Sequence, residues 1–216
     1  MRDIAVIGLG IFGWEVAVQL EKKQGNKVLA IDVDRDVVER IKEHVTEAVR
    51  ADITDENALR ELDLARFNPV ILGLGSNFEK LILGVTHLKR LGAQRIIARA
   101  ATEIQEEILF KVGADEVILP EKQSAVHLVE RINFPSILDY IEIDDEVDLA
   151  EVLVGEELAG KTLRELNLRS KYNVLVLLHK REGCKPKVIT SPDEVFQAND
   201  QLVVVGKEED IGKIFK

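Results

Sequence analysis

The sequence contains a single cysteine, Cys184, among its 216 residues. One cysteine excludes a disulfide within the chain, as is usual for proteins of a reducing compartment. Long apolar runs are also missing, because the longest, in NVLVLL, stops at His179 and Lys180, far short of the roughly 20 residues that cross a bilayer. No basic and apolar leader precedes Ile4. We therefore expect a cytosolic protein that reaches a membrane only through a partner.

Positive charge is in short supply. Lysine and arginine number 29 against 39 aspartates and glutamates, so the formal net charge is -10. A duplex or an anionic lipid surface would be repelled by this average field, and no cluster of lysine and arginine is dense enough to reverse it locally. Nucleic acid is therefore not an expected partner.

Histidine is scarce as well, with four in the chain. His44, His87 and His127 fall within expected helices, His179 closes an expected strand, and none has a cysteine or carboxylate neighbour at a metal-ligand spacing. The sequence therefore predicts surface or core histidines rather than zinc ligands or catalytic bases.

What the sequence does contain is an alternation of short β-branched runs with amphipathic segments over its first two thirds. The expected strands are 3–8, 27–32, 47–49, 68–73, 95–98 and 116–119, and the expected helices between them are 12–23, 36–44, 55–62, 78–91 and 103–112. Parallel neighbours need helical crossovers, and these cover both faces of the sheet. The pattern predicts an α/β, doubly wound, Rossmann-like parallel sheet.

The pattern changes at Pro135, which ends an expected helix over 124–134. Beyond it, residues 141–154 alternate apolar with acidic side chains, as in strands with one solvated face. Further strands are expected at 173–180, 186–189 and 201–206, and helices at 162–168 and 208–215. About 80 residues are too few for a second doubly wound sheet, so we expect two domains, 1–135 and a small α+β domain over 136–216.

Three glycines follow the first expected strand, in IAVIGLGIFGWEVAVQL. Gly8 allows a tight turn, Gly10 allows phosphates to approach backbone amides, and Gly13 allows the helix to pack close to the strand. Asp32 ends the next strand, where an acid accepts hydrogen bonds from ribose hydroxyls. A helix N-terminus favours phosphate charge. Alternatively, the three glycines only shape a tight turn between strand and helix, and Asp32 is only a solvated acid at the end of a strand.

Two more segments are expected at the same sheet edge. The fourth strand ends in VILGLGSN, which places Gly73, Ser76 and Asn77 beside Gly8 at the switch point of the sheet. The sixth strand ends at Pro120 and delivers Glu121 there. Glu121 has two open interpretations, either a solvated acid at a helix start or a ligand of a divalent cation that screens polyphosphate.

The stretches GLGIFG, VLAIDVD, ADITDENAL, VILGLGSNFE, GADEVILPEK and LAGKTLRELNLRSKYNVLVL resemble, in order and spacing, the cytosolic gating subunits of bacterial Trk and Ktr potassium-uptake systems, the KtrA/TrkA family. The resemblance covers essentially the whole chain. It implies a nucleotide-binding RCK N-domain, a small RCK C-domain, and an octameric ring beneath a membrane-embedded potassium pore protein of the KtrB/TrkH kind.

The resemblance also implies ligands and their residues. ATP, ADP or NAD(H) is expected in the glycine turn, with Asp52 near the base and Mg²⁺ or Ca²⁺ held between Glu121 and ATP. The family commonly has arginine where this chain has Ile11, so the usual discrimination between ATP and ADP is in doubt here. The predicted nucleotide-site residues are Gly8, Gly10, Ile11, Phe12, Gly13, Asp32, Asp52, Gly73, Ser76, Asn77, Arg99 and Glu121.

In the C-terminal domain the resemblance implies cyclic di-AMP between paired subunits, with Arg169 and Asn173 as the candidates. Nothing in that domain resembles a catalytic constellation, because Lys161 and Arg164 are expected in solvent and Cys184 in a turn. The sequence therefore predicts a binding protein rather than an enzyme. The alternative is a soluble NAD(P)-dependent oxidoreductase, favoured by the glycine motif and Asp32 alone.

Overall fold

The computed structural model describes residues 2–75, 77–133, 135–144 and 146–215. The chain divides into two compact units, Met1–Lys122 and Gln123–Lys216. Helix α6 (Pro120–Asn133) begins in the first unit and continues in the second. The division into functional domains at Pro135 remains a prediction.

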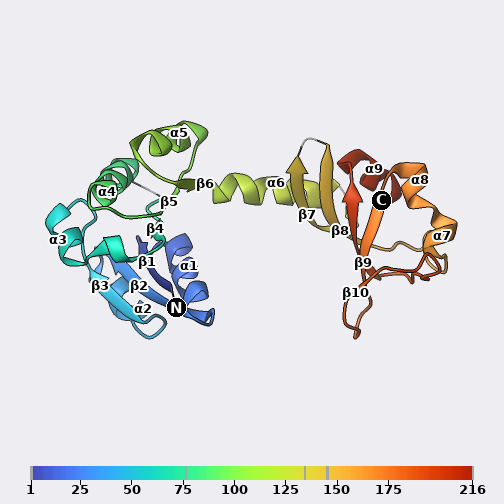
Figure 1. Ribbon diagram of the computed structural model, residues 1–216, viewed down its shortest axis with the longest axis horizontal. Helices are drawn as coiled ribbons and strands as arrows, with labels where there is room; N and C mark the ends of the chain where they lie inside the picture. Colours follow the sequence, from blue (N-terminus) through green and yellow to red (C-terminus); the bar gives the residue numbers. More distant parts are fainter. Residues whose placement is uncertain (1, 76, 134, 145, 216) are drawn as a thin grey trace. The chain divides into compact units, whose positions relative to one another are not determined.

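The first unit contains a six-stranded parallel sheet (Figure 1). Its strands are β1 (Arg2–Ile7), β2 (Asn26–Asp32), β3 (Glu47–Arg50), β4 (Val70–Leu72), β5 (Ile96–Arg99) and β6 (Glu116–Ile118). They lie in the order β3-β2-β1-β4-β5-β6. The chain leaves β1 in one direction and returns at β4 to build the other, so the switch point lies between β1 and β4. The doubly wound sheet expected from the sequence is confirmed.

Alternate residues of β1 enter two different cores. Ile4 and Val6 pack in a cluster with residues of α1 (Ile11–Lys22) and α2 (Arg35–Ile41), whereas Ala5 and Ile7 pack in a cluster with residues of the other helices. Those other helices are α3 (Glu56–Glu61), α4 (Phe78–Arg90) and α5 (Glu103–Val112), with the short 3-10 helix Leu64–Arg66. Because successive side chains of a strand point to opposite faces, helices cover both sides of the sheet.

The helices of this unit begin where polar side chains replace missing backbone hydrogen bonds. Asp34 caps α2, Asp55 caps α3, Asn77 caps α4 and Thr102 caps α5, each accepting from a backbone amide of the first turn. Helix α1 differs, because its N-cap is Gly10 and none of the described side chains caps it. Its first amides are therefore left for water or a ligand.

The second unit is a five-stranded sheet in the order β10-β9-β11-β8-β7, with antiparallel pairing throughout. The strands are β7 (Ile137–Asp144), β8 (Val147–Leu153), β9 (Leu175–Lys180), β10 (Lys187–Val188) and β11 (Gln201–Gly206). The expected acidic and apolar alternation over 141–154 therefore runs through two strands, β7 and β8. The small α+β domain predicted from the sequence is confirmed.

Helices α7 (Leu163–Leu166), α8 (Leu168–Tyr172) and α9 (Glu208–Ile214) complete the second unit. A single helix was expected over 162–168, but Asn167 adopts a left-handed conformation with φ 47° and separates α7 from α8. Phe196, Phe215 and Ile211 are almost fully buried in the core. Among the described residues, no helix has the length and apolar character needed to span a bilayer.

Candidate functional site

The turn between β1 and α1 depends on glycine for its shape. Gly8 has φ +87°, a conformation that side chains disfavour, and a β-carbon on Gly13 would overlap the carbonyl oxygen of Gly8. Gly73 lies against the same turn, because a β-carbon there would come within 2.7 Å of that oxygen. A β-carbon on Gly10 would meet nothing within 4 Å. The turn is therefore tightly packed on the protein side and open at Gly10.

Asp32 links the end of β2 to this turn. Its Oδ2 accepts a hydrogen bond from the backbone amide of Leu9 at 2.6 Å, and its Oδ1 accepts from the amide of Asp34 at 2.9 Å. A carboxylate oxygen accepts more than one hydrogen bond, so these contacts leave acceptor positions for hydroxyl groups of a ligand.

A crevice of about 740 Å³ opens at the switch point. It is lined by Gly8, Gly10, Ile11, Phe12, Glu15, Asp32, Gly73, Leu74, Gly75, Arg99 and Glu121. The structure thus brings together most of the predicted nucleotide-site residues from the ends of β1, β2, β4, β5 and β6. The sequence analysis missed Glu15, Leu74 and Gly75, although each follows a predicted site residue within four positions.

A smaller hollow of about 40 Å³ adjoins the crevice, since Gly8, Asp32 and Leu74 line both. Its other lining residues are Ile7, Val33, Ala51, Asp52, Ile53 and Lys80. The lining is mostly apolar, with two acidic groups, Asp32 and Asp52, and one basic group, Lys80, a composition that suits the flat face and polar rim of a heterocyclic base.

Asp52 is fixed in the lining of this hollow by three hydrogen bonds. Its Oδ1 accepts from the amide and the hydroxyl of Thr54, at 3.0 and 2.8 Å, and its Oδ2 accepts from Nζ of Lys80 at 3.2 Å. The bonds from Thr54, and then the charge of Lys80, lower the pKa of Asp52 below its usual value. Asp52 is therefore ionised at neutral pH. Lys80, which the sequence analysis did not single out, is its partner.

Arg99 is the only cationic side chain among the described residues that line the crevice. Its Nη2 pairs with Oε1 of Glu121, and its guanidinium carbon lies 5.9 Å from the ring centre of Phe12. Its Nε is buried and has no hydrogen-bond partner among the residues that the structure describes. The hydrogen bond from Arg99 lowers the pKa of Glu121 below its usual value. A buried guanidinium nitrogen that lacks an acceptor is a place where an anionic ligand would gain a charge-assisted bond.

The charges of the crevice do not suit a polyanion by themselves. Arg99 stands against the three carboxylates of Glu15, Asp32 and Glu121. Ile11, which follows Gly10 at the start of α1, is 96% exposed and adds no charge. A triphosphate would therefore meet net negative charge unless a cation accompanied it.

A divalent metal in the crevice could take ligands both from the protein and from a phosphorylated ligand. Among the described residues no three histidines, cysteines, aspartates or glutamates form a group that could hold an ion. Glu121 has a side chain that is 61% exposed at the crevice, so it can supply one carboxylate while phosphate oxygens supply the others. The residues fit a cation bound together with a phosphorylated ligand.

Four predicted site residues are not among the described residues that line the crevice. Gly13 packs against Gly8, and Asp52 lines the smaller hollow; the others are Asn77 and Ser76. Asn77 caps α4, with its side-chain oxygen 3.1 Å from the amide of Lys80, and its contact with a nucleotide remains a prediction. Ser76 lies outside the described residues. In the second unit, Arg169 and Asn173 are exposed, with Asn173 in a left-handed conformation at the end of α8, and their role also remains a prediction.

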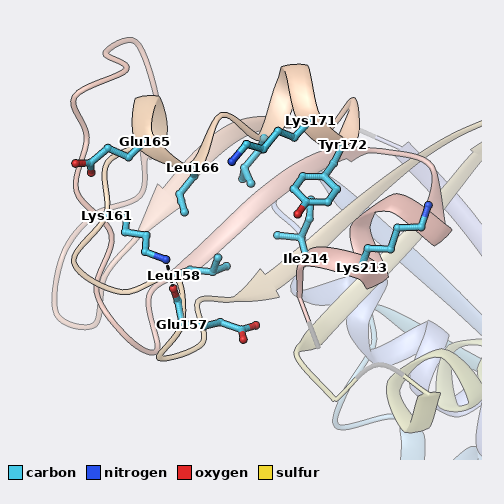
Figure 2. A pocket seen from close by; sticks show the side chains of 10 residues that line it. Glu157, Leu158, Lys161, Glu165, Leu166, Lys171, Tyr172, Lys213 and Ile214 are labelled. Carbon is cyan, nitrogen blue, oxygen red and sulfur yellow. Dashed lines mark hydrogen bonds between the residues drawn. The ribbon is translucent and has the colours of Figure 1, made fainter.

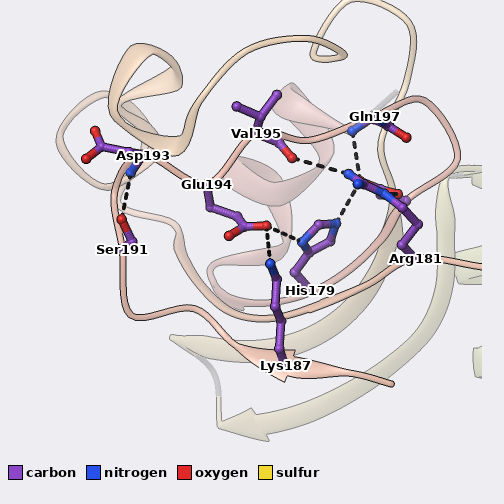
Figure 3. Close-up of polar contacts among 9 residues, drawn as sticks. His179, Arg181, Lys187, Ser191, Asp193, Glu194, Val195 and Gln197 are labelled. Atoms are coloured by element: carbon purple, nitrogen blue, oxygen red, sulfur yellow. Dashed lines mark hydrogen bonds and ion pairs between the residues drawn. The ribbon is translucent and has the colours of Figure 1, made fainter. Parts of the chain in front are cut away.

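The second unit contains a polar cluster that sequence spacing did not reveal (Figure 3). His179 is 3% exposed, with Nδ1 3.0 Å from Glu194 and Nε2 2.7 Å from Asp200. Arg181 donates two hydrogen bonds to Asp200, and Lys187 pairs with Glu194. His179 is a core residue, as the sequence predicts, but its carboxylate partners lie 15 and 21 residues away in the chain, so sequence spacing gave no sign of them.

Burial alone would raise the pKa of Asp200, but hydrogen bonds from Arg181, the amide of Gln197 and His179 outweigh it and hold that pKa well below its usual range. The hydrogen bond from Lys187 lowers the pKa of Glu194. Both carboxylates are paired with neighbouring charged groups, so the cluster joins β9 and β10 to the segment 194–200 that precedes β11.

Comparisons with known proteins agree with this architecture. Residues 4–120 match the TrkA-N domain family and residues 149–216 match the TrkA-C domain family. The chain is 36% identical over 217 aligned positions to Ktr system potassium uptake protein C of Bacillus subtilis, covering 100% of this chain and 96% of that protein. It is 33% identical to Ktr system potassium uptake protein A of the same organism, covering 97% of this chain and 94% of that protein.

Among solved structures, the GsuK RCK domain matches with a TM-score of 0.70 and 17% identity, over 99% of this chain. This chain spans 47% of the length of that protein. At such identity the match shows the fold alone. The two family matches and the full-length relatives show more: the chain belongs to the KtrA/TrkA family of potassium-uptake regulatory subunits, with an RCK N-domain followed by an RCK C-domain.

Proposed function

We propose that this chain is a nucleotide-sensing regulatory subunit that controls a membrane-embedded potassium transporter. The observation that supports it most is the crevice at the switch point, where the glycine turn, Asp32 and Arg99 converge. Membership of the family indicates that the chain acts in potassium uptake, and the crevice offers a site at which a nucleotide would regulate it.

The ligand of the crevice is an adenine nucleotide, ATP, ADP or NAD(H). Its phosphates lie at the uncapped first turn of α1 near Gly10, its ribose hydroxyls donate to Asp32, and its base lies in the small hollow beside Asp52. GsuK, which shares this fold, has been solved bound to NAD and bound to ADP, in structures that match with TM-scores of 0.64 and 0.50.

Arg99 and Glu121 exchange partners when a triphosphate binds. In the structure they pair with one another. With ATP, Glu121 would hold Mg²⁺ or Ca²⁺ and Arg99 would pair with phosphate oxygens; the cation would supply the positive charge that offsets the repulsion between the carboxylate and the phosphates. NAD(H) and ADP carry less negative charge than ATP and need this exchange less.

The regulatory unit is a ring, an octamer of subunits divided at Pro135 into domains 1–135 and 136–216. The ring lies in the cytoplasm against the inner face of the membrane and contacts the potassium transporter subunit. A nucleotide changes the ring only if it binds one of its conformations more tightly than another. Cyclic di-AMP is a second effector, bound in the C-terminal domain at Arg169 and Asn173.

The chain is not an enzyme in this proposal. No histidine or lysine lies among the described residues that line the crevice, so the usual acid-base partner of a nicotinamide reaction is missing there. The alternative function is that of a soluble NAD(P)-dependent oxidoreductase. It is tested by following nicotinamide absorbance in the presence of small alcohols and hydroxy acids. Turnover with any of them would favour this alternative.

The test of function combines ligand and transport. The nucleotide that co-purifies with the protein is first identified by mass spectrometry. Potassium uptake is then measured in cells that depend on the pore protein, with the wild-type subunit, with Asp32→Ala and with Asp34→Ala as the matched control. We expect uptake to fall with Asp32→Ala alone. Equal uptake with all three proteins would contradict the proposal.

A further inference from the structure

The second unit contains a hollow that the proposed function does not use (Figure 2). Its volume is about 550 Å³. The lining residues are Glu157, Leu158, Lys161, Glu165, Leu166, Leu168, Lys171, Tyr172, Lys213 and Ile214. They come from the loop before α7 and from α7, α8 and α9, and they include neither Arg169 nor Asn173. The hollow is therefore distinct from the predicted cyclic di-AMP site.

Its floor is apolar and fixed. Leu166, Leu168 and Ile214 are 8%, 2% and 5% exposed and belong to the hydrophobic core of the second unit. Leu158 packs against the same core and also lines the hollow. Because these side chains are held by the core, an apolar ligand group would meet a preformed surface.

Some polar groups of the hollow already have a hydrogen bond or an ion pair within the protein, and others do not. Lys161 donates to the carbonyl of Glu157 at 2.7 Å, and Lys213 pairs with Asp210 at 2.6 Å. Among the described residues, Lys171 and the hydroxyl of Tyr172 have neither a hydrogen bond nor an ion pair. In Figure 2 the side chains of Lys171 and Tyr172 extend over Leu166 and Ile214, whereas Lys213 extends away from them.

The carboxylates at the rim limit the charge of a ligand. Glu165 accepts from the amide and hydroxyl of Thr162, at 2.7 and 2.8 Å, in the capping box of α7, so its charge is already hydrogen-bonded. Three lysines against Glu157 and Glu165 leave the lining net positive in a chain whose net charge is -10. The balance suits one acid group and disfavours a polyanion.

We propose that this hollow is a binding site for a small organic anion that carries one acid group on an apolar or aromatic body. The acid group binds between Lys171 and the hydroxyl of Tyr172. The body lies on Leu158, Leu166 and Ile214. Both parts of the ligand are required. The amino group of Lys171 and the hydroxyl of Tyr172 are exposed to water, so their contacts with an anion alone contribute little binding free energy.

Matched probes test this assignment by isothermal titration calorimetry on the full chain. The probes are 1-naphthyl phosphate, which has both parts, 1-naphthol, which lacks the acid group, and inorganic phosphate, which lacks the apolar body. We expect 1-naphthyl phosphate to bind once per chain, about tenfold more tightly than either of the others, since each loses one class of contact.

Variants then locate the site. Lys171→Gln is expected to weaken 1-naphthyl phosphate about tenfold and Tyr172→Phe about threefold, while Lys185→Gln, an exposed lysine outside the hollow, leaves the affinity unchanged. Circular dichroism confirms the fold of each variant. Unchanged affinity in both Lys171→Gln and Tyr172→Phe overturns the proposal.

Two further variants separate this hollow from the other sites. If Arg99→Gln weakens the probe and Lys171→Gln does not, the probe binds the nucleotide crevice and the proposal fails. If Arg169→Gln has that effect instead, the anion belongs to the predicted cyclic di-AMP site, and the hollow is again excluded.

Discussion

Asp32 Oδ2 accepts a hydrogen bond from the backbone amide of Leu9 at 2.6 Å, which joins the end of β2 to the glycine turn after β1. The residue expected to hold the ribose is thus also a structural support of the turn that receives the phosphates. Its contribution to nucleotide binding has two parts, direct hydrogen bonding and positioning of the α1 amides.

Asp32→Ala should weaken adenine nucleotide binding by about 2 kcal/mol, because hydrogen bonds to a charged acceptor are lost in a partly desolvated crevice. Asp34→Ala is the control. It removes the cap of α2 and should cost about 1 kcal/mol of folding free energy while leaving binding intact. Calorimetry and thermal unfolding measure the two effects. Equal nucleotide affinity in Asp32→Ala and wild type would place the ribose elsewhere.

Glu121→Gln should abolish most of the gain in ATP affinity that Mg²⁺ or Ca²⁺ provides to the wild type, about tenfold, and should bind metal-free ATP at least as well. ADP should respond less, since it lacks the γ-phosphate. Titrations with Mg²⁺ and with a chelator give the comparison, with Glu103→Gln, whose carboxylate pairs with Lys122, as control. The same metal dependence in wild type and Glu121→Gln would remove this carboxylate from the site.

Ile11→Arg should increase ATP affinity by about 1.5 kcal/mol, because it adds a cation to a crevice in which Arg99 is the only one among the described lining residues. Ile11 is 96% exposed, so the substitution removes little packing. Ile11→Gln controls for polarity without charge. A gain of the same size with glutamine would refute the electrostatic explanation.

Asp200→Asn should destabilise the second unit by about 3 kcal/mol at neutral pH, since it leaves His179 and Arg181 without their buried acid. The folded-state pKa values of Asp200 and Glu194 lie below their unfolded values of roughly 4, so the stabilisation is complete above the unfolded values. It begins to be lost below them and falls further as the pH decreases through the folded-state pKa values.

Thermal unfolding between pH 7 and pH 3 measures this, and Asp200→Asn should lose less stability than the wild type on acidification. Asp193→Asn, in an exposed pair with Arg164, should change stability by no more than about 0.5 kcal/mol. Parallel acid unfolding of wild type and Asp200→Asn would show that the cluster does not control the pH response.

The isolated chain should have a mass above 24 kDa in solution. Leu83 of α4 and Ile104 and Phe110 of α5 are 39%, 71% and 47% exposed, more apolar surface than a solvated helix face needs. Light scattering at micromolar concentration measures the mass. Phe110→Asp should lower it and Lys111→Ala should not. A wild-type mass near 24 kDa would contradict the prediction.

Much of the first unit follows from local patterns. Strand and helix periodicity, capping residues such as Asp55 and Thr102, and the spacing from Gly8 to Asp32 predict the sheet and one edge of the site, because each depends on neighbours close in the chain. Glu15 and Lys80 escaped prediction since charged residues near a helix start are common and carry no distinctive signal. The break at Asn167 was missed for a similar reason, as asparagine tolerates both helical and left-handed backbone.

By itself, the sequence determined the doubly wound sheet, the change to an α+β domain, the glycine turn and the acid at the end of β2. Tertiary structure decided which charges meet. It paired Arg99 with Glu121 and Asp52 with Lys80, placed His179 between Glu194 and Asp200, and gathered Lys161, Lys171 and Tyr172 around an apolar floor. Side-chain charges act over a few ångströms in space, and residues 15 to 28 positions apart come within that range only when the sheets form.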